Sequence, residues 1–425
     1  MASEEKKIKR ILKNPVPPQY RRKKWSRKAI AIVISAVLVC AVAAAVVLPK
    51  LLSQDSVHGS GGAQATLPPP NQVIHLVAGG DVNITDKSVA AGLTEGGYNY
   101  TQIFRDVLPV LSSGDVTMLN FEGVLGGTSY GSVTKAAPPE LMKALASAGV
   151  DILQTANSYS VFDGLRGLNS TLQGVQSAGM TPLGTYGSNE AFEKAGGYLI
   201  WNVQGIKVAF MAFTKGMVNS AGEPAGMPTG SESCVNLLYS DYSSTYQKVN
   251  TEAITQIVRN AAAHEPDVMV ALLHWGSEYN DQISKSQKKI CELLQQEGVD
   301  AIIGTHSHHV QKMEFNPDTG SFVAYSLGDF YGESFGDGKA LSDNYSVLLD
   351  LEITKDGVTG ETKITDFGYV PIFLDNSQDG KLQVLRIKEA MAAYENQYVN
   401  CVSEETYKAM QTALARIESR TGVKS

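Results

Sequence analysis

Short apolar runs alternate with amphipathic stretches along most of the chain, from residue 73 onwards. Runs of about four to eight apolar residues between turn signals are typical of buried strands, and apolar residues at every third or fourth position are typical of helices. The predicted strands are 73–78, 116–121, 152–156, 199–203, 207–213, 268–274, 301–305, 322–327, 345–353 and 362–373, and the predicted helices are 139–148, 165–178, 251–263, 286–297, 384–398 and 404–420. Strands that alternate with helices predict an α/β fold with a layered sheet.

A longer apolar run, residues 29–48, contains no charged residue. Twenty residues in a helix span about 30 Å, which matches the hydrocarbon core of a bilayer. Residues 1–28 carry eleven Lys and Arg against two Glu, so the positive-inside rule predicts a cytoplasmic N-terminus and a main domain outside the cell. A cleaved signal peptide is the alternative, but its apolar region is usually only about 7–15 residues long.

Composition divides the chain into five predicted parts. They are a basic cytoplasmic tail (1–28), a transmembrane anchor (29–50), a flexible linker rich in Gly, Ser and Pro (51–72), a globular domain (73–375) and a C-terminal helical extension (376–425). The net charge is −7 despite the basic tail, so the rest of the chain is acidic, which argues against nucleic acid as the main partner. Four cysteines are too few for a disulfide framework, and one pair or isolated thiols both remain open.

Polar side chains collect where the predicted strands end. Asp81, Glu122, His274, His306 and His308 all follow or close such strands, and an α/β sheet usually binds its ligands at this edge. We therefore expect these five residues on one rim of one sheet. Imidazoles mixed with carboxylates suit divalent transition metals, and a shared carboxylate can bridge two ions that activate water.

Each of these residues also has a purely structural explanation. His274 beside Trp275 could be a hydrogen-bonded core residue, and Asp81 could cap a following helix. A structural domain with a histidine-rich core would bury His274 and His306 away from any site. Gln287, on the predicted helix after His274, is either a site contact or a solvated helix position.

The strand-end residues belong to longer motifs. These are Gly80-Asp81, Asn120-Phe121-Glu122, the segment 157–164, His274-Trp275-Gly276-Ser277-Glu278-Tyr279 with Gln287, Gly304-Thr305-His306-Ser307-His308, and Tyr325-Ser326-Leu327-Gly328-Asp329-Phe330. Their order and spacing resemble the CapA family of poly-γ-glutamate capsule synthesis proteins, in the calcineurin-like metallophosphoesterase superfamily, over residues 73–375. The resemblance implies a four-layer α/β/β/α sandwich with two mixed sheets between helices.

Carried over by position, the resemblance implies a two-metal site. Asp81 and His308 would bind one ion, Glu122 would bridge, and His274 and His306 would bind the other ion. The expected cofactor is two divalent ions, Mn, Zn or Fe.

The third-strand motif departs from the family pattern. The family usually has Ala-Asn-Asn-His, whereas this chain has Ala156-Asn157-Ser158-Tyr159. Ser158 replaces an amide ligand, for which Asn157 and Asp329 are alternatives, and Tyr159 replaces a catalytic imidazole. An unperturbed Tyr has a pKa of about 10 and does not titrate near neutrality. We expect a degenerate site with Ser158 as a weakened ligand and Tyr159 and Asn157 as catalytic candidates.

Two functions are compatible with these features. One is a metal-dependent phosphoesterase-type hydrolase that acts outside the cytoplasm in capsule or poly-γ-glutamate synthesis, export or attachment. The other is a non-catalytic subunit that binds an anionic polymer, such as poly-γ-glutamate, beside membrane synthase subunits. Both place the protein at the cell membrane through its N-terminal helix.

Overall fold

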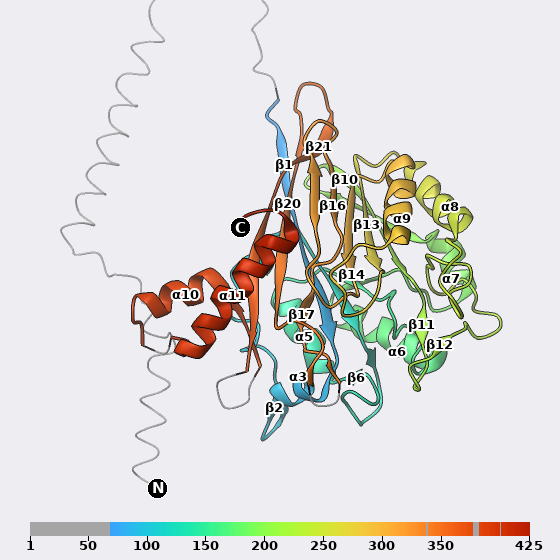
Figure 1. The fold of residues 1–425 in the computed structure, drawn as a ribbon. Helices are drawn as coiled ribbons and strands as arrows, with labels where there is room; N and C mark the ends of the chain where they lie inside the picture. The colour runs from blue at the N-terminus through green and yellow to red at the C-terminus, as the bar shows by residue number, and fades with distance from the viewer. Residues whose placement is uncertain (1–68, 337–338, 377–381, 400) are drawn as a thin grey trace, which may run out of the picture. The chain divides into compact units, whose positions relative to one another are not determined.

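Two mixed β-sheets form the centre of the computed structural model, which describes residues 69–336, 339–376, 382–399 and 401–425 (Figure 1). The first sheet has the strand order β22-β21-β20-β1-β4-β7-β8, with β17 beside β1, and the second has the order β15-β16-β14-β13-β10-β9. The strands of the first sheet are β1 (Gln72–Asn83), β4 (Val116–Glu122), β7 (Ile152–Gln154), β8 (Thr181–Leu183), β17 (Asp329–Tyr331), β20 (Tyr345–Lys355), β21 (Thr362–Asp375) and β22 (Gln383–Arg386). Those of the second are β9 (Tyr198–Val203), β10 (Ile206–Thr214), β13 (Val268–His274), β14 (Ala301–Thr305), β15 (Met313–Asn316) and β16 (Ser321–Ala324).

The side chains of strand β10 contribute to two apolar cores, one on each face of the second sheet. Successive side chains of a strand point to opposite faces. Val208, Phe210 and Ala212 therefore belong to the apolar core between the two sheets, whereas Met211 and Phe213 belong to a second core on the outer face. Strands covered on both faces read as continuous apolar runs, which is why the sequence predicts β10 and β13 well.

Helices cover both outer faces. Helices α8 (Thr251–Ala262) and α9 (Lys285–Gln296) pack their apolar side chains on the second sheet. Helix α5 (Pro139–Ser147) packs on the outer face of the first sheet, in a core that also includes Val175 of α6 (Gly164–Ser177). The described residues thus contain the layers helix, sheet, sheet and helix, which the family resemblance implied.

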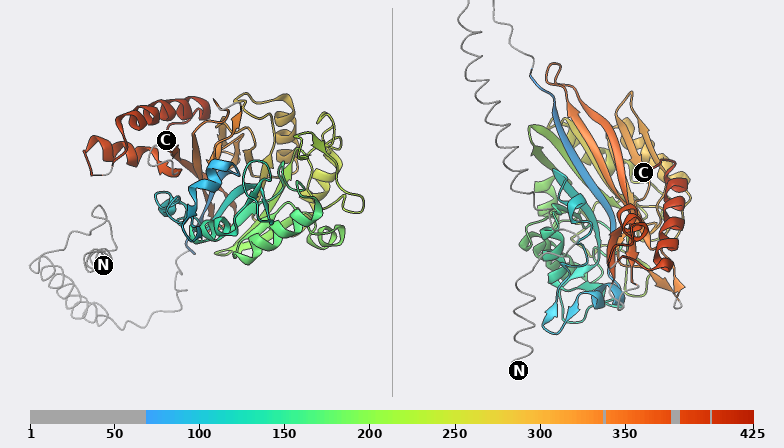
Figure 2. Two further views of the ribbon diagram at one scale, coloured as in Figure 1. Left: turned by 90° about the horizontal axis from the view of Figure 1, so that it is seen from below. Right: turned by 90° about the vertical axis from the view of Figure 1, so that its left-hand side faces the viewer.

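The C-terminal helices α10 (Ile387–Glu395) and α11 (Glu404–Thr421) pack beside β21 (Figure 2). Met410 and Ile417 of α11 are fully buried and join the core between the sheets. The hydroxyl of Tyr369 on β21 donates a hydrogen bond to the carbonyl of Val423 at 2.5 Å. The C-terminal helices therefore extend the main core.

Strand β1 and the predicted helix 384–398 have different boundaries in the structure from those predicted from the sequence. Strand β1 continues past residue 78 to Asn83, so Asp81 lies within the strand. A Cβ at Gly80 would lie 1.7 Å from the carbonyl oxygen of Gly328, so only glycine permits this close approach. Residues 384–386, predicted as the start of a helix, belong to strand β22 because they pair with β21.

The sequence also predicts a basic tail and a membrane anchor at the N-terminus. The predicted basic tail and anchor, residues 1–50, lie outside the described residues. Among the helices that the structure does describe, none combines the length and apolar character needed to cross a bilayer.

Replacing Ile417 with alanine tests the contribution of α11 to the core. We expect Ile417→Ala to lower the free energy of unfolding by about 2–5 kcal/mol, because it removes buried methyl groups and leaves a cavity. Ser419→Ala, at an exposed position of the same helix, should change it by less than about 0.5 kcal/mol. Urea denaturation measures both, and equal stabilities of the two variants would contradict the packing role of α11.

Candidate metal centre

The five strand-end residues lie together, but they come from two sheets. Asp81 and Glu122 belong to β1 and β4 of the first sheet. His274 ends β13 of the second sheet, and His306 and His308 follow β14. The expectation of one rim on one sheet was therefore wrong. Strand β13 pairs with β10 and β14 and not with β4, so the ligand-bearing ends meet across the gap between the sheets.

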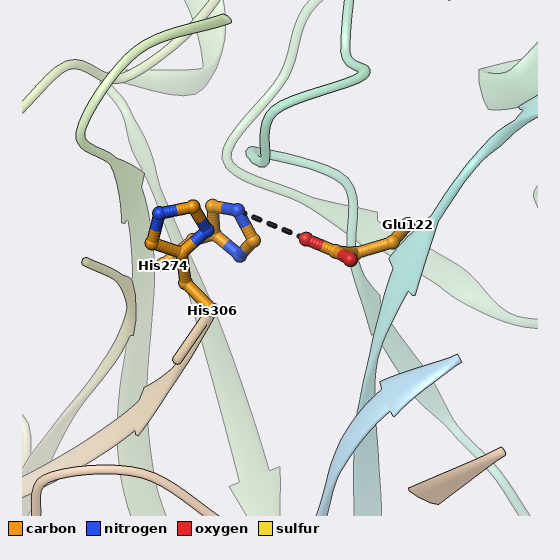
Figure 3. Close-up of side chains that lie close together, drawn as sticks. All are labelled: Glu122, His274 and His306. Carbon is orange, nitrogen blue, oxygen red and sulfur yellow. Dashed lines mark ion pairs between the residues drawn. The ribbon is translucent and has the colours of Figure 1, made fainter. Parts of the chain in front are cut away.

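Glu122 lies at the centre of the cluster. Two groups of potential metal ligands contain its carboxylate. One group also contains His274 and His306, and the other contains Asp81 and His308. Within each group the potential ligand atoms are no more than 4.8 Å apart. Its Oε1 lies 3.0 Å from Nε2 of His274, and its Oε2 lies 3.9 Å from Nε2 of His308. Figure 3 shows Glu122 facing the two imidazoles of the opposite sheet. A carboxylate in this position could serve as a ligand to two cations, one in each group.

His306 has the environment of a ligand more than that of a core residue. Its side chain is 2% exposed, yet neither ring nitrogen has a hydrogen-bond partner. Buried polar atoms almost always have partners, and an orphaned imidazole nitrogen is a ready metal ligand. Its φ of +85° is strained for a residue other than glycine. The alternative interpretation, that His274 and His306 are purely structural, agrees with their burial. It does not explain why the ring nitrogens of His306 lack hydrogen-bond partners.

Neighbouring polar groups orient the carboxylate of Asp81. Asn120 donates a hydrogen bond from Nδ2 to Oδ1 of Asp81 at 2.6 Å, and the backbone N–H of His306 donates to Oδ2 at 3.0 Å. The Nδ2 atom of Asn120 also lies 3.2 Å from Nδ1 of His274. Asn120 therefore touches both halves of the cluster. In the sequence, Asn120 stands within the Asn120-Phe121-Glu122 motif, but its residue type alone does not mark it as a contact of the cluster.

Asp329 serves the His308 side of the cluster. Its Oδ1 lies 2.7 Å from Nδ1 of His308, and its Oδ2 is buried without a partner. A carboxylate on one imidazole nitrogen orients the other nitrogen toward a metal, which here is the Nε2 that faces Glu122. The ring of Tyr279 stacks on His308 at 5.1 Å between centroids. Asp329 thus supports His308 and has no contact with His274 that would replace the missing amide ligand.

The third-strand residues occupy different positions around His274. The hydroxyl of Ser158 lies 3.0 Å from Nε2 of His274. The side chain of Asn157 donates to the carbonyl of Phe121 at 2.6 Å and accepts from the backbone N–H of Tyr159 at 3.0 Å. Asn157 therefore holds the turn, and of these two residues it is Ser158 whose side chain contacts His274.

Burial controls the charge of the cluster. Burial, with the nearby charge of Glu122, raises the pKa of Asp81 to about 7. Burial likewise raises the pKa of Glu122 to about 7 and lowers the pKa of His274 to about 3. Burial also opposes protonation of His308, but the charge and hydrogen bond of Asp329 overcome it and raise the pKa of His308 to about 10. Binding a cation at neutral pH must therefore displace protons from Asp81, Glu122 and His308.

Other residues near the motifs have structural roles. Gln287 is 1% exposed. It completes the capping box at the start of α9, where its Oε1 accepts from the backbone N–H of Ser284 at 2.9 Å. The alternative of a solvated helix position is thus wrong.

Three cysteines, Cys234, Cys291 and Cys401, are free in the described part of the chain.

Metal affinity is expected to rise with pH between pH 6 and 8. Below about pH 7, protons on Asp81 and Glu122 compete with the cation, and each displaced proton steepens the dependence by up to about ten-fold per pH unit. Titration calorimetry with Mn²⁺ in two buffers of different ionisation enthalpy measures both affinity and proton release. Affinity that does not change with pH, without proton release, would contradict the protonation states derived above.

Comparison with known proteins supplies an independent result. The chain is 26% identical over 240 residues to the capsule biosynthesis protein CapA of Bacillus anthracis, which covers 55% of this chain and 54% of that protein. It is 24% identical over 276 residues to the PGA biosynthesis protein CapA of Bacillus subtilis (strain 168), which covers 62% of this chain and 64% of that protein. The chain thus spans less than two thirds of the length of both relatives.

Among solved structures, the calcineurin-like phosphoesterase YfkN from Bacillus subtilis matches with a TM-score of 0.43 and 14% identity, over 82% of this chain and 98% of that one. The family model of the bacterial capsule synthesis protein PGA_cap matches residues 75–334. This span is more than half of the chain and contains every residue of the cluster around Glu122. The chain therefore belongs to the PGA_cap family of bacterial capsule synthesis proteins, which includes the CapA proteins.

Proposed function

We propose that this protein is a capsule biosynthesis component with a two-metal hydrolytic site of the phosphoesterase type. The observation that carries the proposal is the position of Glu122, whose carboxylate is common to two groups of potential ligands. Two adjacent divalent ions lower the pKa of bound water and stabilise the charge that develops on a phosphoryl group. A cluster that served only folding would not leave His306 with two unpartnered ring nitrogens.

The residues divide into two ligand sets. Asp81 and His308 would hold one ion, His274 and His306 the other, and Glu122 both. Asn120 orients Asp81, and Asp329 orients His308. These hydrogen bonds hold the ligands in place before a cation arrives, which favours tight binding. On the His274 side Ser158 stands in place of an amide ligand, so we expect the weaker of the two sites there.

Tyr159 is the remaining candidate for proton transfer. Burial raises the pKa of Tyr159 above its usual range, so the phenol stays protonated at neutral pH and can donate but not accept a proton. A phenol of high pKa is a poor general acid compared with an imidazolium, because proton transfer is most efficient when the pKa lies near the working pH. Slow turnover is the expected consequence.

Family membership and the basic, apolar N-terminus support a cellular role. We propose that residues 29–50 anchor the protein in the cell membrane and that the described domain acts outside the cytoplasm. There it would act in synthesis, export or attachment of a capsular polymer such as poly-γ-glutamate, together with membrane synthase subunits. The relatives named for capsule and PGA biosynthesis support this assignment.

A second candidate function is non-catalytic binding of the polymer. It is favoured by the Ser158 and Tyr159 replacements, which remove an amide ligand and an imidazole from the third-strand motif. In that case the metal centre would organise the binding surface without turnover.

Elemental analysis of the purified full-length protein tests the metal centre. We expect close to two equivalents of Mn, Zn or Fe, and a loss of at least one equivalent in His306→Ala, because His306 has no other partner that would explain its burial. His264→Ala is the matched control, since His264 is exposed and bonds to Tyr198. Wild-type protein that stays free of metal after incubation with these ions would overturn the proposal.

Restoring the family motif separates the two functions. If the protein is a slow hydrolase, Tyr159→His should raise kcat on phosphoester substrates by about 10²–10⁴, the usual contribution of a general acid. Ser158→Asn should add an oxygen ligand and strengthen metal binding on the His274 side. Phosphoester hydrolysis assays with Mn²⁺ measure the first effect and calorimetry the second. No activity in wild type or in the double variant, with both ions bound, would favour the non-catalytic role.

A further inference from the structure

Two lysines are attached through their backbones near ligands of the metal centre, one close to Glu122 and the other beside His274. Lys135 precedes β6 (Ala136–Ala137), and its backbone carbonyl accepts a hydrogen bond from Val124 at 2.8 Å, two residues after Glu122. Lys215 follows β10, and its backbone N–H donates to the carbonyl of His274 at 2.8 Å. The backbone of Lys215 therefore bonds directly to a ligand residue of the cluster, and the backbone of Lys135 bonds to a residue two positions after Glu122.

The ammonium groups of both lysines lack a carboxylate partner. In the described part of the chain, no Asp or Glu oxygen lies within 4.0 Å of either Nζ, whereas Lys87, Lys312 and Lys355 each have such a partner. Nζ of Lys135 bonds only to the carbonyl of Ile84 at 3.4 Å and lies 4.6 Å from the ring centre of Tyr159. Nζ of Lys215 bonds to the carbonyl of Gly276 at 3.1 Å and lies 4.8 Å from the ring centre of Tyr246.

These environments are unfavourable for a cation that remains unpaired. Both side chains are partly buried, and burial lowers the pKa of each lysine. A partly desolvated ammonium group gains much more from an anion than an exposed one does. Among the described residues, Glu278, which is exposed, is the one carboxylate whose charge acts on both lysines, and the charge of Glu122 also acts on Lys135. Neither carboxylate forms an ion pair with these lysines.

We propose that Lys135 and Lys215 form an oxyanion-binding site beside the metal centre and hold the phosphate or carboxylate group of the substrate. The proposal deepens the proposed function, and it relies on that function only for the identity of the neighbouring ions. Two divalent ions would outweigh the negative charge of Asp81, Glu122 and Asp329, so a dianion bound by the lysines would meet a positive site. The exposed carboxylate of Glu278 competes with that dianion for the lysines.

The alternative is that both lysines only support the loops through their carbonyl and aromatic contacts. Removing the charge then changes stability but not anion binding. Lys→Gln variants suit this distinction, because an amide retains hydrogen bonding to the carbonyl groups of Ile84 and Gly276. Lys→Met variants provide a second pair if the amide side chain disturbs folding.

Calorimetric titration with inorganic phosphate tests the proposal on the full-length protein, loaded with Mn²⁺ and after treatment with a chelator. Lys135→Gln and Lys215→Gln are each expected to weaken phosphate binding by about ten-fold or more, the usual loss for a charged hydrogen bond. Lys408→Gln removes the same charge at a distant exposed ion pair with Glu404 and should not weaken binding. Glu278→Gln should strengthen it.

Separate outcomes distinguish this proposal from the proposed function. Unchanged phosphate affinity in both lysine variants, with metal content and thermal midpoint as in wild type, overturns the oxyanion site and leaves the metal centre intact. Lysine-dependent phosphate binding in a protein that takes up no metal supports the oxyanion site and overturns the hydrolytic function. Titration with a γ-linked glutamate oligomer in place of phosphate then shows whether the site prefers carboxylate or phosphate groups.

Discussion

A carboxylate from one sheet and an imidazole from the other meet at 3.0 Å, where Glu122 faces His274. Both side chains are buried, and this contact depends on the distance between the two sheets. That distance is set by the apolar core between them, to which β10, β13, β1 and β4 all contribute. The ligand geometry is thus a consequence of side-chain packing several residues away, along strands that are covered on both faces.

Burying this cluster opposes folding, because carboxylates and imidazoles lose their hydration. This loss of hydration is the main cause of the raised pKa of Asp81 and Glu122 and of the lowered pKa of His274. Hydrogen bonds from Asn120 and from the backbone of His306 offset part of it on the Asp81 side. A bound cation would offset more, because it favours the ionised carboxylates and the neutral imidazoles at the same time.

The C-terminal helix also supports the loops around the centre. Arg420 on α11 forms ion pairs with Asp343 and, at 3.4 Å, with Asp281. Asp343 in turn contacts Nδ1 of His309, directly after His308. The helix is therefore tied to the loop that carries two of the ligands. This gives the C-terminal segment, whose role could not be assigned from the sequence, a place in the organisation of the site.

The sequence by itself determined most strands and helices and the identity of the five central residues. Continuous apolar runs mark strands buried on both faces, and polar residues at their ends stand out against that pattern. It did not determine that β13 and β14 lie in a separate sheet from β1 and β4, because strand pairing depends on contacts between distant segments. Nor did it select Asn120, Lys135 or Lys215, which resemble ordinary polar residues until folding brings them near Glu122 and His274, and it did not show that Asp329 contacts His308. Residue type and spacing are properties of the chain, whereas burial, missing partners and distances across two sheets exist only in the folded protein.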